Sequence, residues 1–91
     1  MLYAIAFDVT NNKRRYRVNK VLLRYGLRVQ KSVFEAHLST KQLEAIKQKL
    51  LQAIDPNTDS LRYYNLGEVW RDRVTVQGIS ELTPEIDYVV V

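Results

Sequence analysis

The sequence predicts an α+β fold in which two helices cover one face of a single small β-sheet. Two segments carry apolar residues at helical spacing, and the remaining apolar segments show the alternation or the continuous runs that are typical of strands. The chain has 91 residues, which is enough for one domain and not for two. A domain of this size hides only about 60–65% of its unfolded surface, so a partner chain is a reasonable expectation.

The first strand and the first helix occupy the N-terminal third of the chain. Residues 2–9 are apolar apart from Asp8 and predict a buried central strand. Residues 10–12 follow as a turn that can also cap a helix. Residues 13–25 predict an amphipathic helix, and Gly26 stands where a C-terminal cap glycine belongs. The apolar stripe of this helix comprises Val18, Val21, Leu22 and Tyr25.

The middle of the chain leaves two topologies open. Over residues 27–38 the apolar period is two, which predicts one long strand that is bulged or broken near Lys31 and Ser32. If this segment is instead two strands, the order becomes a ferredoxin-like β-α-β-β-α-β. From the residues alone we favour one long strand of βαβ type. Both topologies place the two helices on one face of the sheet.

The second helix begins at a predicted capping box, in which Ser39 is followed by Gln42 three positions later. It ends at Asp55-Pro56-Asn57, because proline cannot continue the hydrogen-bond ladder. Its apolar face comprises Leu43, Ile46, Leu50, Ala53 and Ile54.

Three further strands are predicted at residues 60–66, 73–77 and 86–91. The last has five apolar residues among its six, which would make an adhesive edge on a monomer. We therefore expect it to pair with the sheet of a second protomer in a symmetric homodimer. The alternative is an edge strand in the sheet of its own chain.

The composition excludes several classes of protein. Without cysteine the chain has no disulfides, no cysteine-ligated zinc and no thiol nucleophile, and the single His37 removes paired-histidine sites. No apolar run approaches the roughly 18–20 residues of a membrane span, and no signal pattern stands at the N-terminus. We expect a soluble cytoplasmic protein that does not contact a membrane.

Positive charge is concentrated in one segment. The net charge is only +4, yet residues 9–34 contain eight cations and no acid, while nine of the ten acids lie from Glu35 onward. Four of the cations recur at helical spacing and form one stripe, which spans about 16 Å and could follow several phosphates. The stripe comprises Lys13, Arg17, Lys20 and Arg24. It predicts binding of a polyanion, with a solvated helix face as the alternative.

Asp8 is the candidate for metal chemistry. It ends a predicted buried strand, where α/β sheets place ligands, and it directly precedes the basic segment. One carboxylate is too few for a firm Mg²⁺ site, but a homodimer with Asp8 of each chain near the twofold axis would supply two. The alternative is an Asx turn that starts the helix. Arg14 and Arg15 are expected to point toward Asp8, where they would pair with it or hold a phosphate, and Arg14 is also a candidate nucleic-acid-binding residue.

Four stretches of the chain carry a family resemblance: LYAIAFDV, NNKRRYRVNKVLLRYG, RVQKSVFEAHL and SLRYYNL. Together they resemble the small CRISPR-associated endoribonuclease family, the smaller protein of the CRISPR spacer-acquisition pair. The resemblance spans residues 1–78. It implies a ferredoxin-like β-α-β-β-α-β domain over those residues and a homodimer in which residues 79–91 lie as an extra strand on the partner's sheet.

The resemblance also implies a chemistry and partners. It implies Mg²⁺, or another divalent cation, shared by the two Asp8 carboxylates of a dimer, and hydrolysis of RNA or DNA phosphodiesters. Phe7 stands where the family often has tyrosine, so that hydroxyl is absent. The family's second role is a non-catalytic scaffold that holds duplex DNA and bridges two dimers of the larger CRISPR integrase. Besides Asp8, the candidate catalytic residues by position are Arg15, Arg17, Arg28 and Phe34.

Overall fold

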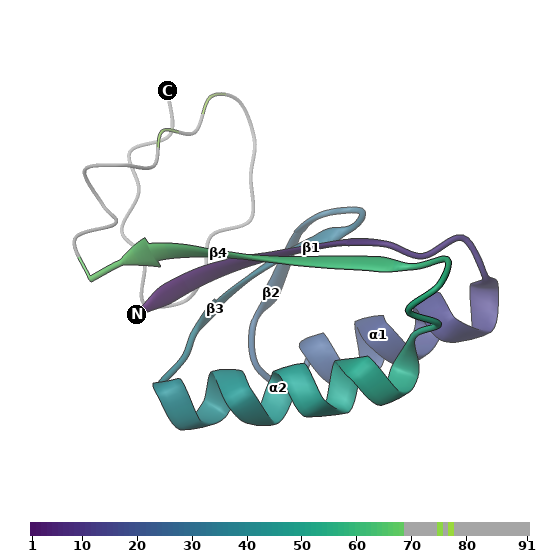
Figure 1. Ribbon diagram of the computed structural model, residues 1–91. Helices are drawn as coiled ribbons and strands as arrows, with labels where there is room; N and C mark the ends of the chain where they lie inside the picture. Colours follow the sequence, from purple (N-terminus) through teal and green to yellow (C-terminus); the bar gives the residue numbers. More distant parts are fainter. Residues whose placement is uncertain (69–74, 76, 78–91) are drawn as a thin grey trace.

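The computed structural model describes residues 1–68, 75 and 77. Within them the chain forms a four-stranded antiparallel sheet of order β2-β3-β1-β4 and two helices (Figure 1). The order along the chain is the ferredoxin-like β-α-β-β-α-β that the resemblance implied. The elements are β1 (Leu2–Asp8), α1 (Asn12–Leu22), β2 (Leu27–Gln30), β3 (Val33–His37), α2 (Thr40–Ala53) and β4 (Ser60–Gly67).

The single long strand that we favoured over residues 27–38 is wrong, because the chain reverses at Lys31 and Ser32. The segment forms the hairpin β2–β3, in which Leu27 pairs with Glu35 and a register shift follows Arg28. A hairpin keeps the alternation of apolar and polar residues on both of its strands. The period of two therefore could not distinguish one strand from two.

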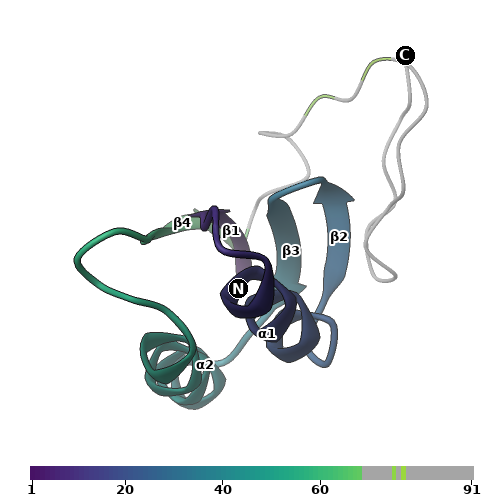
Figure 2. The same cartoon turned by 90° about the vertical axis from the view of Figure 1, so that its right-hand side faces the viewer.

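Both helices lie on the same face of the sheet, as predicted (Figures 1 and 2). Alternate residues of β1 point toward them, so that Tyr3, Ile5 and Phe7 are buried while Asp8 is exposed. The predicted apolar faces are also confirmed: Val18 and Leu22 of α1 and four residues of α2 are buried, and the other members pack partly buried against this core. The four in α2 are Leu43, Ile46, Leu50 and Ala53.

The helix ends follow from local hydrogen bonds. The side chain of Asn11 accepts from the Arg14 amide and caps α1, and the predicted capping box of α2 is present, with Gln42 N to Ser39 Oγ at 3.1 Å. Helix α1 ends at Leu22, three residues before the predicted end. Its last turn tightens, because the amide of Tyr25 donates to the carbonyl of Leu22.

Several sequence predictions fall on the C-terminal part of the chain. The predicted strand at residues 86–91 lies outside the described residues, and so does the predicted strand at 73–77 apart from Thr75 and Gln77. The exchange of the last strand between protomers therefore stays a prediction. Among the described residues, no helix is long and apolar enough to cross a membrane.

Candidate functional site

Asp8 lies at the end of β1, on the sheet face that the helices leave uncovered. In the antiparallel pairing of β1 with β4, Asp8 stands opposite Ser60 and Ala6 opposite Arg62. Directly paired residues point to the same face of a sheet. Within residues 1–68, no cation forms an ion pair with the Asp8 carboxylate, so neither of the alternatives in which Arg14 or Arg15 pairs with it is realised.

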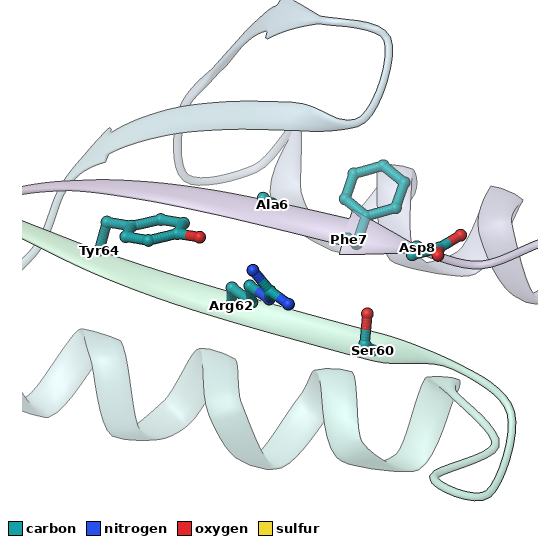
Figure 3. Close-up of a pocket in the computed structure, with 6 residues that line it drawn as sticks. All are labelled: Ala6, Phe7, Asp8, Ser60, Arg62 and Tyr64. Atoms are coloured by element: carbon teal, nitrogen blue, oxygen red, sulfur yellow. The ribbon is translucent and has the colours of Figure 1, made fainter.

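One hollow opens from Asp8 across β4 (Figure 3). Its volume is about 250 Å³, and its lining comprises Ala6, Phe7, Asp8, Ser60, Arg62 and Tyr64. The hydroxyl end of Tyr64 points along the strand toward Arg62. A hydrogen bond with the Tyr64 side chain raises the pKa of the Arg62 guanidinium, so a permanent cation shares this face with the carboxylate.

Arg62 and Ser60 were missed by the sequence analysis. Their proximity to Asp8 depends on the register between β1 and β4, which are separated by more than 50 residues in the chain. The signal that could have found them is the alternation in β4, which places residues 60, 62 and 64 on one face once the topology is known.

A second hollow opens on the other side of Asp8. Its volume is about 200 Å³, and its lining comprises Phe7, Asp8, Val9, Thr10, Arg15, Lys31 and Ser32. Arg15 lies beside Asp8 as predicted, but it donates to the backbone, from Nη1 to the carbonyls of Val9 at 3.3 Å and Thr10 at 3.4 Å. It thereby fixes the loop that follows Asp8. A guanidinium has five N–H donors, so donors remain for an anionic ligand.

Arg14 pairs with a buried carboxylate of its own chain. Its Nε donates to Asp59 Oδ2 at 2.8 Å and its Nη2 to Oδ1 at 3.4 Å, and the Asp59 side chain has no exposed surface. The hydrogen bond from Arg14, followed by that from the Asp55 amide, keeps the pKa of Asp59 below its ordinary value. Arg14 thus pairs its charge with Asp59 within the described chain, and its assignment to the nucleic-acid surface stays a prediction. Spacing could not reveal a partner 45 residues away.

The basic stripe is exposed along its whole length. Lys13, Arg17 and Lys20 project from α1, whereas Arg24 lies in the turn beyond the end of the helix. Within the described part of the chain, none of these four cations pairs with an acid. The outer face of α1 thus presents uncompensated positive charge.

The remaining candidates, Arg28 and Phe34, do not line either hollow beside Asp8. Arg28 is exposed on the edge strand β2, opposite Phe34 in register. Phe34 is 0% exposed, and its ring centroid lies 6.2 Å from that of Phe7. A buried ring supports Phe7, the residue before Asp8, but it does not reach a ligand on the surface of the described chain.

The residues around Asp8 fit a divalent cation only in part. No group of three or more histidine or acidic side chains gathers within residues 1–68, 75 and 77. Asp8 contributes one exposed, unpaired carboxylate, whereas Mg²⁺ takes several oxygen ligands even when it keeps waters. A second anionic oxygen, from the Asp8 of another protomer or from a substrate phosphate, would complete such a site.

Known proteins share this sequence and fold. Residues 1–74 match the family described as CRISPR associated protein Cas2. The "CRISPR-associated endoribonuclease Cas2 3" of Chloroflexus aurantiacus is 40% identical over 85 residues, which cover 93% of this chain and 91% of that protein. A crystal structure of Streptococcus pyogenes Cas2 has a TM-score of 0.77 at 40% identity, over 86% of this chain and 100% of that one. A chain of a partial Cas6-RT-Cas1–Cas2 complex has a TM-score of 0.68 at 35% identity, over 80% of each chain.

Proposed function

The chain belongs to the CRISPR associated protein Cas2 family, and from this premise we propose that it is the nucleic-acid-binding homodimer of CRISPR spacer acquisition. The larger CRISPR integrase is its expected partner in the cytoplasm, and the similarity to a chain of a complex with Cas1 supports this. The observation that carries the proposal is the exposed stripe of Lys13, Arg17, Lys20 and Arg24, which has no acidic partner among the described residues.

The stripe suits a phosphate backbone because its charges are both free and aligned. A cation that is already paired must give up its partner before it binds a phosphate, whereas these cations only displace water and counterions. Each phosphate that they neutralise contributes about −0.9 to the slope of log affinity against log salt for duplex DNA. Four contacts predict a slope of about −3.6.

The test compares two triple variants that lose the same charge. One removes the helical part of the stripe (Lys13→Ala, Arg17→Ala, Lys20→Ala), and the control removes three cations of α2 (Lys41→Ala, Lys47→Ala, Lys49→Ala). Fluorescence anisotropy with a labelled DNA duplex at several salt concentrations gives the slope for each protein. We expect the stripe variant to lose about 2.7 from the slope, as three lost contacts require, and the control to keep it. Equal slopes in the two variants would contradict the proposal.

A second function, hydrolysis of phosphodiesters, is favoured by the surroundings of Asp8. Its carboxylate is exposed and unpaired within the described chain, and it stands between two hollows that contain Arg62 on one side and Arg15 and Lys31 on the other. The two Asp8 carboxylates of a homodimer would hold Mg²⁺ or another divalent cation. When bound, such an ion supplies a Lewis acid that lowers the pKa of water.

The cations around Asp8 would act on the substrate. The guanidinium groups of Arg15 and Arg62 can receive the anionic phosphate, while the fixed loop after β1 keeps Asp8 in place. Arg17 and Arg28 lie farther along the surface and would hold the flanking backbone. Phe7 has no hydroxyl, so it contributes packing beside Asp8 and no proton.

Asp8→Asn separates hydrolysis from the non-catalytic scaffold role. Cleavage of RNA and DNA is measured with Mg²⁺ and with EDTA, and spacer acquisition is measured in cells with the same variant. We expect cleavage to fall to the level seen with EDTA, because the amide cannot replace an anionic oxygen ligand. Full cleavage by the variant would exclude this mechanism. Acquisition that persists without cleavage would support a scaffold that bridges the integrase dimers.

A further inference from the structure

An aromatic side chain stands within the basic stripe on α1. Tyr16, on α1, leaves 64% of its surface exposed, more than the other large exposed hydrophobic residues of the described chain. Tyrosine commonly buries its ring and exposes only the hydroxyl group to solvent. An exposed ring is therefore a feature to be explained by what binds it.

Cations flank Tyr16 in both directions along the helix. Lys13 lies three positions before it and Lys20 four positions after it, so both flank the ring along the helix. Lys20 Nζ lies 5.9 Å from the ring centroid. These residues line a shallow hollow of about 420 Å³ along α1. Its full lining is Asn12, Lys13, Tyr16, Arg17 and Lys20.

The hollow combines an apolar platform with uncompensated positive charge. Within the described residues, none of its three cations pairs with a carboxylate, so an occupant must be anionic as well as flat or apolar. A nucleotide offers both properties, because its base stacks on an aromatic ring while its phosphate meets the cations. Bases inside a duplex are stacked on one another and do not present a free face to the surface of a helix.

We infer that Tyr16 is a stacking platform for an unpaired nucleobase, with Lys13, Arg17 and Lys20 holding the phosphates on either side. The inference rests on the proposed nucleic-acid-binding function and adds to it a preference for single strands or for the unpaired ends of a duplex. Because every base has a π-face, the platform tolerates any sequence. The amide of Asn12, at the start of the hollow, can donate to or accept from the edge of a base.

The experiment compares Tyr16→Ala with Tyr16→Phe, which keeps the ring. Affinities for a labelled single-stranded oligothymidylate and for a blunt duplex of equal length are measured by fluorescence anisotropy. We expect Tyr16→Ala to lose about fivefold or more of its affinity for the single strand, and Tyr16→Phe to stay within about twofold of the original chain. Duplex affinity should not change in either variant. An oligonucleotide that carries one 5-iodouracil should photocrosslink to the peptide that contains Tyr16.

Arg17→Ala, measured alongside, distinguishes failure of this inference from failure of the proposed function. It should weaken the binding of single strands and duplexes alike, since it removes a phosphate contact. If Arg17→Ala weakens the affinity for both the single strand and the duplex while Tyr16→Ala changes neither affinity, the stacking inference is overturned. The exposed ring would then be explained by contact with a protein partner. If neither variant changes any affinity, the nucleic-acid-binding function of this helix fails as well.

Discussion

The two sides of α1 use the same kind of side chain for opposite purposes. On the inner side, Arg14 meets the buried carboxylate of Asp59 and joins the start of the helix to the loop before β4. On the outer side, Lys13 and Arg17 have no acidic partner within the described chain and face solvent. The sequence places these cations within five consecutive positions, yet only those on the outer side are without an acidic partner in the described chain.

The difference teaches how a run of positive charge should be interpreted. In a basic segment on a helix, the helical period turns some cations toward the protein and others toward solvent. The inward cations can pair with acidic side chains of the same chain, as Arg14 does. Arg14 and Asp59 compensate each other through hydrogen bonds, so their charges are largely cancelled. The functional charge of a segment is therefore smaller than the count of its cations.

Phe34→Ala tests whether an inward-facing candidate residue on β3 serves the fold, as Arg14 does on α1. It should have the largest effect on stability. We expect a loss of about 3–5 kcal/mol in the free energy of unfolding, because the ring is fully buried and its removal leaves a cavity beside Phe7. Chemical denaturation measures the loss. Phe34→Leu should recover most of the stability and, with it, any nucleic-acid cleavage. A folded Phe34→Leu protein that had lost only cleavage would show instead that the ring itself takes part in the chemistry.

Asp59→Asn tests the inner side of α1. We expect a lower midpoint of thermal unfolding, because the neutral amide leaves Arg14 without its counter-charge. The control Lys13→Ala should leave the midpoint almost unchanged and weaken DNA binding, which Asp59→Asn should affect far less. If both variants changed stability and binding to the same extent, the two sides of the helix would not be distinct.

The pH dependence of the same variant gives an independent check. Because Arg14 lowers the pKa of Asp59 in the folded chain, the pair stabilises the fold above the ordinary pKa of an aspartate. This stability is lost as the pH falls through the lowered pKa of the folded state. Acid unfolding monitored by circular dichroism should therefore show a steeper loss of stability below about pH 4 in the original chain than in Asp59→Asn.

The residues that could be predicted from the sequence are those whose roles are local. The presence of helix α1, the capping box at Ser39 and the exposure of the stripe follow from spacing over a few residues, although the end of α1 does not. The partner of Arg14 and the proximity of Arg62 to Asp8 depend on strand register and on contacts across the chain. The break between β2 and β3 was visible only as an ambiguity, because alternation survives a reversal of the chain.

The adjacent tyrosines of β4 show the same division on a smaller scale. Tyr63 faces the helices, with Lys47 Nζ 5.5 Å from its ring centroid, whereas Tyr64 lies exposed on the open face beside Arg62. Burial raises the pKa of Tyr63 to about 12. The folded chain therefore keeps this proton at a pH where the unfolded chain loses it, so stability should fall as the pH rises from about 10 toward 12.

Ultraviolet absorption during an alkaline titration measures this smallest effect. We expect one tyrosine to ionise at a higher pH than the exposed ones, and Tyr63→Phe to remove that late component while Tyr64→Phe leaves it in place. The loss of stability at high pH should become shallower only in Tyr63→Phe, because phenylalanine has no proton to lose. A late component that disappears in Tyr64→Phe instead would place the protected hydroxyl on the open face and reverse the comparison between the two sides of the sheet.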